Sequence, residues 1–465
     1  LMHDLTRRRF LEDSMLATMA SLSVSSLASG QELGARLSQA DTVKVLNPMD
    51  QVPLSFIIDD STCLVNLAHF CIPQFAEVYP DQYKQDWRKL PREIPDSFVR
   101  EFADWCNEHG IKGKYSVVPN PACVGWIDRD LPGWTRSELE QSVSLVREEL
   151  MPNWDIHPEM ITHTWVIDTK TGRPYSDRTE RSMEIFGWSQ DKSADELANY
   201  MNYGLNVLKN VGFQCDGITT PGGFASENRV NLAKASLQAC RDVFQTEIPH
   251  YFRDIFDTGS KSVVPRVELA AGLDSDKPEC VVSIAGCTGD WFGGWDGLRV
   301  GSADRFITPD GEGGRLPEII KRGEPTILVC HWPGIFSNGD KSGFKIFQEV
   351  VKRVHSRFDN VAWMKLSEIA RYWAAKELTA LHHQDNQIAF YAPFASPYFT
   401  IEIKASPAKT LLYTGANGVT SLKRVNTKAQ LETNTWVSTK SGAIACIDLP
   451  KGDSFLQLNG AASTQ

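Results

Sequence analysis

The sequence predicts an α/β protein: a distorted (β/α)7-type barrel followed by a small C-terminal β-sandwich domain. Short apolar runs alternate with helical patterns over most of the 465 residues, which is typical of parallel strands with helices packed outside them. The alternation stops near Leu381, and only short β-like runs follow. We therefore place the barrel at 40–380 and the small domain at 385–465. An open doubly wound sheet is the alternative to the barrel.

Seven apolar runs are the predicted barrel strands. They lie near 53–58, 113–118, 160–167, 215–220, 280–285, 326–330 and 361–364. The predicted helices lie near 96–109, 136–149, 193–211, 226–244, 343–355 and 366–381. The helix near 193 has the clearest signals, because Ser193 and Glu196 can form a capping box and Gly212 follows the last turn. Segment 253–275 has little periodicity and is predicted to be a long loop over the barrel mouth.

The C-terminal segment contains β-like runs separated by Pro, Gly and Asn. These runs lie at 388–391, 399–403, 410–413 and 443–448. Because no long helical pattern interrupts them, they predict a sandwich. This domain would either bind substrate or support the packing of the barrel.

The first thirty residues have the pattern of a targeting segment. The run Thr6-Arg7-Arg8-Arg9-Phe10-Leu11 is similar to a twin-arginine export motif, an uncharged stretch follows it, and small residues precede Gly30. We expect export to the periplasm or the extracellular space. The alternative is a basic N-terminal helix of a cytoplasmic protein.

Composition excludes some functions. A net charge of −10 disfavours a broad nucleic-acid surface, which needs clustered Lys and Arg. No apolar run reaches the length of a membrane span. The ten cysteines are scattered without a CxxC pair, and several lie in apolar runs, so we expect buried free thiols.

Reactive and turn-forming residues follow the predicted strands. In a parallel barrel such strand ends meet on one face, where functional groups collect. The positions concerned are Asp59-Asp60, Pro119-Asn120, His163 and Asp168, Pro221-Gly222-Gly223, Asp290-Trp291 and His331-Trp332. Their convergence predicts one site at that face.

Three of these positions carry the predicted chemistry. Asp59 and Asp60 are costly to bury together unless a cation offsets their repulsion, so one would bind a metal and the other would act as general base. His163 would pair with Asp60 as a second ligand. His331, beside Trp332, suits a general acid. The alternatives are a capping role for the aspartates and a core position for each histidine.

Several segments, in order over roughly 50–370, resemble the polysaccharide deacetylases of the NodB-homology type, which fold as a distorted (β/α) barrel. The matching segments are Phe56-Ile57-Ile58-Asp59-Asp60, Met160 to Trp165, Thr219-Thr220-Pro221-Gly222-Gly223, Asp290-Trp291 and Leu328-Val329-Cys330-His331.

The resemblance implies an exported hydrolase that uses a divalent metal, such as zinc, to remove acetyl groups from a carbohydrate. Asp59 would be the base, Asp60 and His163 would be metal ligands, and His331 would be the acid, with Asp290 also in the catalytic set. The residues that would contact substrate are Trp291, Trp332, Asn120, Gly222 and Gly223.

The sequence departs from the family in two places. The second histidine of the metal motif, four residues after His163, is replaced by Ile167, so Asp168 is the expected third ligand, with His157 and His69 as alternatives. The arginine of the Pro-Gly loop is missing. A glycosidase that uses Asp60 with Asp168 or Asp290 is one alternative function, and a non-catalytic carbohydrate-binding protein is another.

Overall fold

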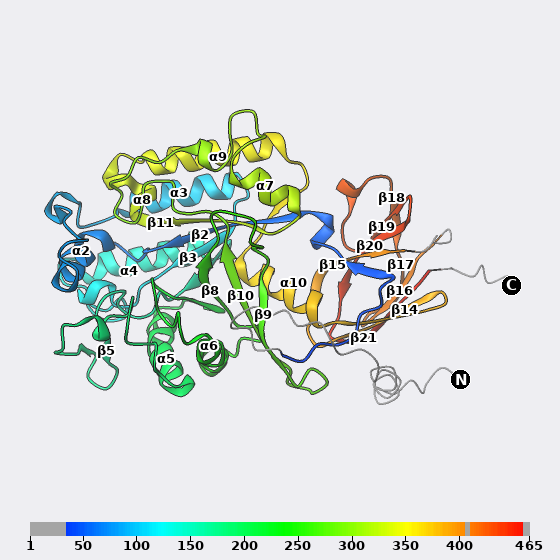
Figure 1. Cartoon of the computed structure of the whole chain (residues 1–465), viewed down its shortest axis with the longest axis horizontal. Coiled ribbons are helices and arrows are strands. Elements are labelled where there is room, and N and C mark those ends of the chain that lie inside the picture. The colour runs from blue at the N-terminus through cyan, green and yellow to red at the C-terminus, as the bar shows by residue number, and fades with distance from the viewer. Residues whose placement is uncertain (1–33, 405–409, 459–465) are drawn as a thin grey trace.

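The computed structural model describes residues 34–404 and 410–458, and the predicted export segment at 1–30 lies outside them. Helices surround two sheets in the larger part of the chain, and the described C-terminal part is made of strands and one short 3-10 helix, η8 (Lys428–Gln430) (Figure 1). The predicted α/β class is confirmed. In the described part of the chain, no helix combines the length and apolarity needed to cross a membrane.

The first sheet is built around β2 (Val52–Asp59), whose residues are all buried. Its other strands, all parallel to their neighbours, are β11 (Thr326–His331), β3 (Gly113–Ser116), β4 (Trp154–His157) and β12 (Val361–Trp363). Because β2 is central, its apolar run is covered on both faces, as expected for a parallel sheet.

The second sheet is mixed. Its strands are, in spatial order, β7 (Gly217–Thr219), β8 (His250–Ile255), β10 (Glu279–Gly286) and β9 (Arg266–Ala271), and only β9 runs antiparallel to its neighbour.

The two sheets approach each other at both edges. A parallel bridge joins Glu159 and Thr219 beyond β4, and the N–H of Cys287 donates to the carbonyl of Ile327 at 2.8 Å. No described strand of one sheet pairs along its length with a strand of the other, so the described strands form two sheets that nearly meet and not one closed barrel.

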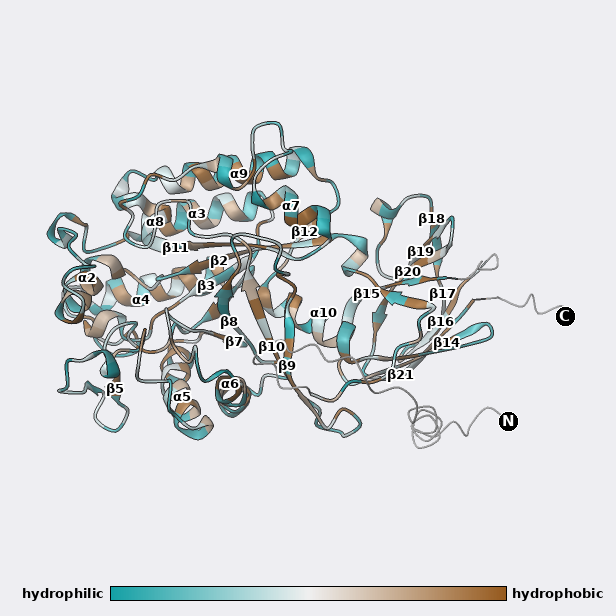
Figure 2. Ribbon diagram, in the orientation of Figure 1, coloured by the Kyte–Doolittle hydropathy of each residue, from teal (hydrophilic) through white to brown (hydrophobic). Residues whose placement is uncertain are grey.

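Helices cover the outer faces of these sheets. They are α2 (Leu67–Val78), α3 (Asp96–Glu108), α4 (Arg136–Leu145), α5 (Ala194–Asn210), α6 (Arg229–Phe244), α7 (Arg315–Arg322), α8 (Trp332–Phe336), α9 (Ser342–Arg357) and α10 (Leu366–Leu378). Their polar faces point outward and their apolar faces meet the strands (Figure 2). The capping box of Ser193 and Glu196 is confirmed at the start of α5. The sequence patterns did not predict α2, which contains Pro73, because proline is usually a helix breaker.

The C-terminal part consists of two five-stranded sheets that share one apolar cluster. Their strands are β13 (Ala380–Gln384), β14 (Gln387–Ala392), β15 (Ser396–Ile403), β16 (Leu412–Gly415), β17 (Gly418–Ser421), β18 (Lys423–Val425), β19 (Thr435–Thr439), β20 (Gly442–Leu449) and β21 (Gly452–Gln457). The early strand β1 (Val43–Val45) joins them by pairing with β15.

Two predicted elements were wrong. The third strand is not at 160–167: β4 ends at His157, and the next residues form an irregular but buried segment. Its side chains are apolar because the segment is buried. Hydrophobic periodicity alone cannot distinguish such a buried irregular segment from a buried strand. The segment 253–275 is not one long loop, because it contains the end of β8 and all of β9. All ten cysteines are free, as predicted, and only Cys123 is not fully buried.

Candidate active site

Asp59 and Asp60 lie at the carboxyl end of β2, buried as predicted. Asp59 forms an ion pair with Lys114 of β3. The ammonium of Lys114 is fully buried and also donates to the carbonyl of Ile58 at 3.1 Å and to Ser116 Oγ at 2.8 Å. A buried lysine with these partners fixes the position of the Asp59 carboxylate.

Asp60, Glu159 and His163 form a compact buried group, named here the rim group. Asp60 Oδ1 lies 3.1 Å from Nε2 of His163, and Glu159 Oε1 lies 3.6 Å from Nδ1 of His163. The N–H of Asp60 donates to Glu159 Oε2 at 2.8 Å. One ligand atom from each residue lies within 4.8 Å of the others.

The rim group suits a divalent cation. Two carboxylates and one imidazole are a common donor set for zinc and similar ions. Asp60 Oδ1 and His163 Nδ1 are buried and make no hydrogen bond, although His163 Nε2 and Glu159 Oε1 lie 3.1 and 3.6 Å from them. A cation at this place would offset the repulsion between the two buried carboxylates.

The segment that carries His163 is shaped by one buried carboxylate. Glu184 accepts hydrogen bonds from the backbone N–H groups of Ile161 (3.2 Å), Thr162 (3.0 Å) and His163 (2.5 Å). His163 itself has φ +67°. Burial raises the pKa of Glu184 to about 7, although its hydrogen bonds from Tyr200 and the backbone act in the opposite direction. Glu184 therefore holds this irregular segment, and His163 with it, in place.

His331 ends β11 and pairs with Asp290. Its Nδ1 lies 2.8 Å from Asp290 Oδ2. Burial by itself lowers the pKa of His331, but the carboxylates of Asp60, Asp290 and Asp59 outweigh it and raise this pKa to about 10. The imidazolium is therefore the form present at neutral pH.

Burial and neighbouring charges also give the carboxylates of the site different pKa values. Burial raises the pKa of Asp59 to about 6, against the opposing effect of Lys114. Burial likewise raises the pKa of Asp60, opposed by His163 and His331. For Glu159, burial is outweighed by His163, Lys114 and the Asp60 N–H, which hold its pKa below the usual value. Groups with such different proton affinities in one place are typical of acid–base sites.

A cavity of about 370 Å³ opens beside the pair of His331 and Asp290, and Trp291 and Trp295 also line it. Trp295 belongs in addition to an aromatic cluster next to the rim group: the ring of Phe75 lies 6.2 Å from that of His163 and 6.0 Å from that of Trp295. Aromatic faces of this kind are suited to stacking on apolar faces of a ligand.

Several predicted residues lie elsewhere. Asp168 lies in β5 (Ile167–Asp168), where its carboxylate accepts from Lys170 N–H and Thr171 Oγ of its own turn. The fully buried Trp332 packs between the rings of Phe98 and Phe102 in the core. Asp168 was predicted wrongly because the third strand was placed too far along the chain. Trp332 was predicted wrongly because the chain turns inward at the start of α8.

Three other predicted contacts are backbone or packing positions in this structure. Asn120 is buried, and its N–H donates to the carbonyl of Ile161 at 2.8 Å. Gly222 and Gly223 pack against Ile185, whose carbonyl accepts from the Gly223 N–H at 2.7 Å. The alternative ligand His69 lies beside Trp87, with Nδ1 2.8 Å from the Leu90 carbonyl.

Lys114, Glu159 and Glu184 were not predicted from the sequence. Lys114 had a signal, because a charge inside the apolar run 113–118 is costly unless it is paired. Glu159 lies four residues before His163, so the expected spacing was present on the other side of the histidine. Glu184 lies outside every predicted strand end and had no local signal.

The comparisons with known proteins are sparse. No family model and no curated protein matches the chain. Among solved structures, an allantoinase has 12% identity over 70% of this chain and 90% of its own, with a TM-score of 0.34. A family 30 xylanase from Clostridium acetobutylicum has 8% identity over 92% and 100%, with a TM-score of 0.30. A family 5 glycoside hydrolase from Bacteroides vulgatus has 10% identity over 80% and 87%, with a TM-score of 0.29. Scores this low carry no argument about function.

Proposed function

We propose that this protein is an exported carbohydrate-active hydrolase of the NodB-homology type, which removes acetyl groups with the help of a divalent cation held by Asp60, Glu159 and His163. The observation that carries the proposal is the rim group itself. Two carboxylates and an imidazole are buried together, with one ligand atom of each within 4.8 Å of the others, and two of their polar atoms make no hydrogen bond.

Two residues at other sequence positions would take the places of the two residues that are missing from the family pattern. Glu159 would take the part of the missing second histidine, since its carboxylate reaches the same place from four residues before His163. Lys114 would take the part of the missing arginine, since it pairs with Asp59. The two sheets, nearly meeting at both edges, would correspond to a distorted (β/α)7 barrel, and the two C-terminal sheets to a sandwich.

Asp59 would act as the base and His331 as the acid. When bound, a divalent cation would polarise the acyl carbonyl and make a water molecule more acidic. Asp59, with a pKa of about 6, is ionised at neutral pH and can accept the proton of that water, while Lys114 holds its carboxylate still. His331, protonated at neutral pH, can give a proton to the departing nitrogen or oxygen of the sugar, and its Nδ1 contact with Asp290 orients the ring.

The aromatic side chains beside the site support a carbohydrate substrate. Phe75, Tyr83 and Trp295 form one cluster, with Tyr83 and Trp295 rings 5.8 Å apart and Trp295 partly exposed at the cavity. Trp291 lines the same cavity. Rings that flank a polar centre are well placed to stack on a sugar while an acyl group enters between the carboxylates.

An acetate-release assay on acetylated oligosaccharides, with and without a chelator, tests the proposal. We expect release of acetate, its loss after chelation, and its return when Zn²⁺ or Co²⁺ is added back. Cleavage of glycosidic bonds that a chelator does not affect would instead identify a glycosidase with paired carboxylates. Sugar binding without turnover, tested by calorimetry on the same oligosaccharides, would identify a binding protein.

A further inference from the structure

A second group of acidic and imidazole side chains lies deeper in the same sheets. Asp155 and His157 alternate along β4, so their side chains point to the same side of the strand, and His250 begins β8. All three residues are buried. Nε2 of His157 lies 3.0 Å from Nε2 of His250, and Nε2 of His250 lies 4.0 Å from Asp155 Oδ2. We name these three residues the inner group.

The two imidazoles converge on a space that a glycine leaves open. A Cβ atom at Gly217 would lie 2.6 Å from Nε2 of both His157 and His250. The other nitrogen of His157, Nδ1, lies 3.3 Å from Thr219 Oγ. A metal-bound histidine is usually held in this way, with one nitrogen facing the ion and the other bonded to the protein.

Asp155 divides its two oxygens between different partners. Oδ1 accepts from Ser367 Oγ at 2.8 Å and lies 3.7 Å from Nζ of Lys365. Oδ2 accepts from the N–H of Ser367 at 2.6 Å and is the oxygen nearest to His250. Lys365 thus faces the far side of the carboxylate and leaves Oδ2 directed toward the histidines.

The other charges near the inner group are Lys114, Lys365 and Asp216. Lys114 is already paired with Asp59. Asp216 interacts with His250 and lies at the start of β7. Each of the two lysines is thus paired with a carboxylate, and Asp216 adds a negative charge beside His250.

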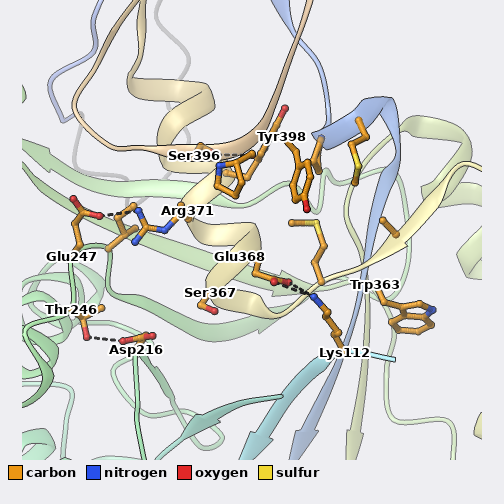
Figure 3. A pocket seen from close by; sticks show the side chains of 17 residues that line it. Lys112, Asp216, Thr246, Glu247, Trp363, Ser367, Glu368, Arg371, Ser396 and Tyr398 are labelled. Atoms are coloured by element: carbon orange, nitrogen blue, oxygen red, sulfur yellow. Dashed lines mark hydrogen bonds and ion pairs between the residues drawn. The ribbon is translucent and has the colours of Figure 1, made fainter. Parts of the chain in front are cut away.

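A cavity offers a route to the inner group from the side opposite the rim group. It has a volume of about 360 Å³ and is lined by Asp216, Glu247, Ser367 and Glu368, among others. Figure 3 shows these side chains together with Lys112 and Arg371, which pair with Glu368 and Glu247. Because Ser367 also bonds to both oxygens of Asp155, one residue separates the cavity from the inner group.

We propose that Asp155, His157 and His250 form a second divalent-cation site, which binds a zinc-like ion and ties β4 and β8 together. Tetrahedral zinc with bonds of about 2.0–2.1 Å separates its ligand atoms by roughly 3.3 Å, and the separations of 3.0 and 4.0 Å lie on either side of this value. The ion would bind Nε2 of both histidines and Oδ2 of Asp155, at the place beside Gly217. Its role would be structural, since the inner group is enclosed.

Binding of Co²⁺ to a full-length variant that lacks the rim group tests this site. The double variant Asp60→Asn/His163→Gln would be freed of metal, titrated with Co²⁺, and analysed by mass spectrometry of the metal and by visible absorbance. We expect one Co²⁺ per chain with the strong d–d bands of a tetrahedral ion. A double variant that binds no Co²⁺ overturns the proposal, whatever the rim group does in the wild-type protein.

A third substitution identifies the ligands. Adding His250→Gln to the double variant should abolish Co²⁺ binding, and retention of the ion would overturn the assignment. If that variant does not fold, His250→Cys replaces it, and a thiolate-to-Co²⁺ charge-transfer band in the near ultraviolet is expected. A folded His250→Cys variant that binds Co²⁺ without this band also overturns the assignment. Lys345→Gln, on the exposed side of α9, is the matched surface control and should leave binding unchanged.

Discussion

The rim group and the inner group share a strand and differ in their surroundings. Asp155, His157 and Glu159 alternate along and just beyond β4, so one strand supplies both groups. The inner group is buried, its residues bond to one another, to Thr219 and to Ser367, and one of its polar atoms, His250 Nδ1, makes no hydrogen bond. The rim group lies near His331 and Asp290, which line a cavity, and two of its buried polar atoms, Asp60 Oδ1 and His163 Nδ1, make no hydrogen bond. The comparison teaches that one strand can supply the same residue types to two places with different surroundings, to which we assign a structural and a reactive role.

Replacement of Glu159 by glutamine should have the largest effect on this contrast. Glu159→Gln removes a charge from the rim group without changing its size, and we expect kcat/KM for acetate release to fall about 1000-fold, roughly 4 kcal/mol. The melting temperature should change little. The matched control is Asp168→Asn, which removes a carboxylate outside the rim group and should retain activity. Equal losses in both variants would contradict the assignment of Glu159.

Loss of the buried lysine should mainly destabilise the fold. Lys114→Met leaves Asp59 buried without its partner, and we expect the free energy of unfolding to fall by about 3–5 kcal/mol, because an unpaired buried charge is costly. Urea unfolding measures this loss. The double variant Lys114→Met/Asp59→Asn should recover part of it, since both charges are then absent. No recovery would mean that Lys114 stabilises the fold through contacts other than Asp59.

Replacement of Asp155 by asparagine tests whether the inner group is structural. Asp155 accepts two hydrogen bonds from Ser367, and hydrogen bonds to a charged group contribute about 1.5–3 kcal/mol each. We expect Asp155→Asn to lower the free energy of unfolding by about 2–3 kcal/mol, measured by urea unfolding. Turnover per folded molecule should fall less than in Glu159→Gln. If Asp155→Asn lowers turnover as much as Glu159→Gln does while the free energy of unfolding is unchanged, the structural assignment of the inner group is wrong.

The pH dependence of acetate release should show the titration of Asp59 and of His331. The variant Asp290→Asn should change this dependence, and the expected effect is the smallest of the four. Activity should rise with pH as Asp59 loses its proton and fall as His331 loses its proton; a cation held by Asp60 would place both limbs below the pKa values of about 6 and about 10 that these groups have without it. Asp290→Asn removes a negative charge that raises the pKa of His331. The alkaline limb should therefore move about one pH unit lower, while the acid limb stays in place. An unmoved alkaline limb would exclude His331 as the acid.

The sequence located the chemistry better than it located the ligands. The end of β2 was predictable, because an apolar run followed by two aspartates is typical of a buried parallel strand that delivers its carboxylates to the edge of the sheet. His331 and Asp290 were predictable for the same reason, and the structure brings them together. Local patterns were sufficient wherever a strand and its functional residue are adjacent in the chain.

The remaining residues depended on the path of the chain between elements. The buried segment 158–166 has the composition of a strand, so the third strand was predicted near 160–167 although β4 ends at His157. Glu159 was therefore overlooked, and Asp168 was chosen as the third ligand. Its real shape depends on Glu184, a carboxylate about twenty residues away that satisfies its N–H groups. Trp332 was assigned to the substrate because it follows His331, although the chain turns into α8 there and carries the ring into the core.

The short strand β1 has a consequence for how this molecule is made. It precedes β2 by only a few residues, yet it pairs with β15. Val43 is opposite Ile403 in this pair, so β1 cannot form its hydrogen bonds until residue 403 has been synthesised. The earliest described strand therefore stays without its neighbour until most of the polypeptide has left the ribosome, and closing so long a loop is slow. An unpaired edge of this kind is open to wrong partners in the meantime. Completion of the last sheets, and not of the helical part, should thus mark the end of folding.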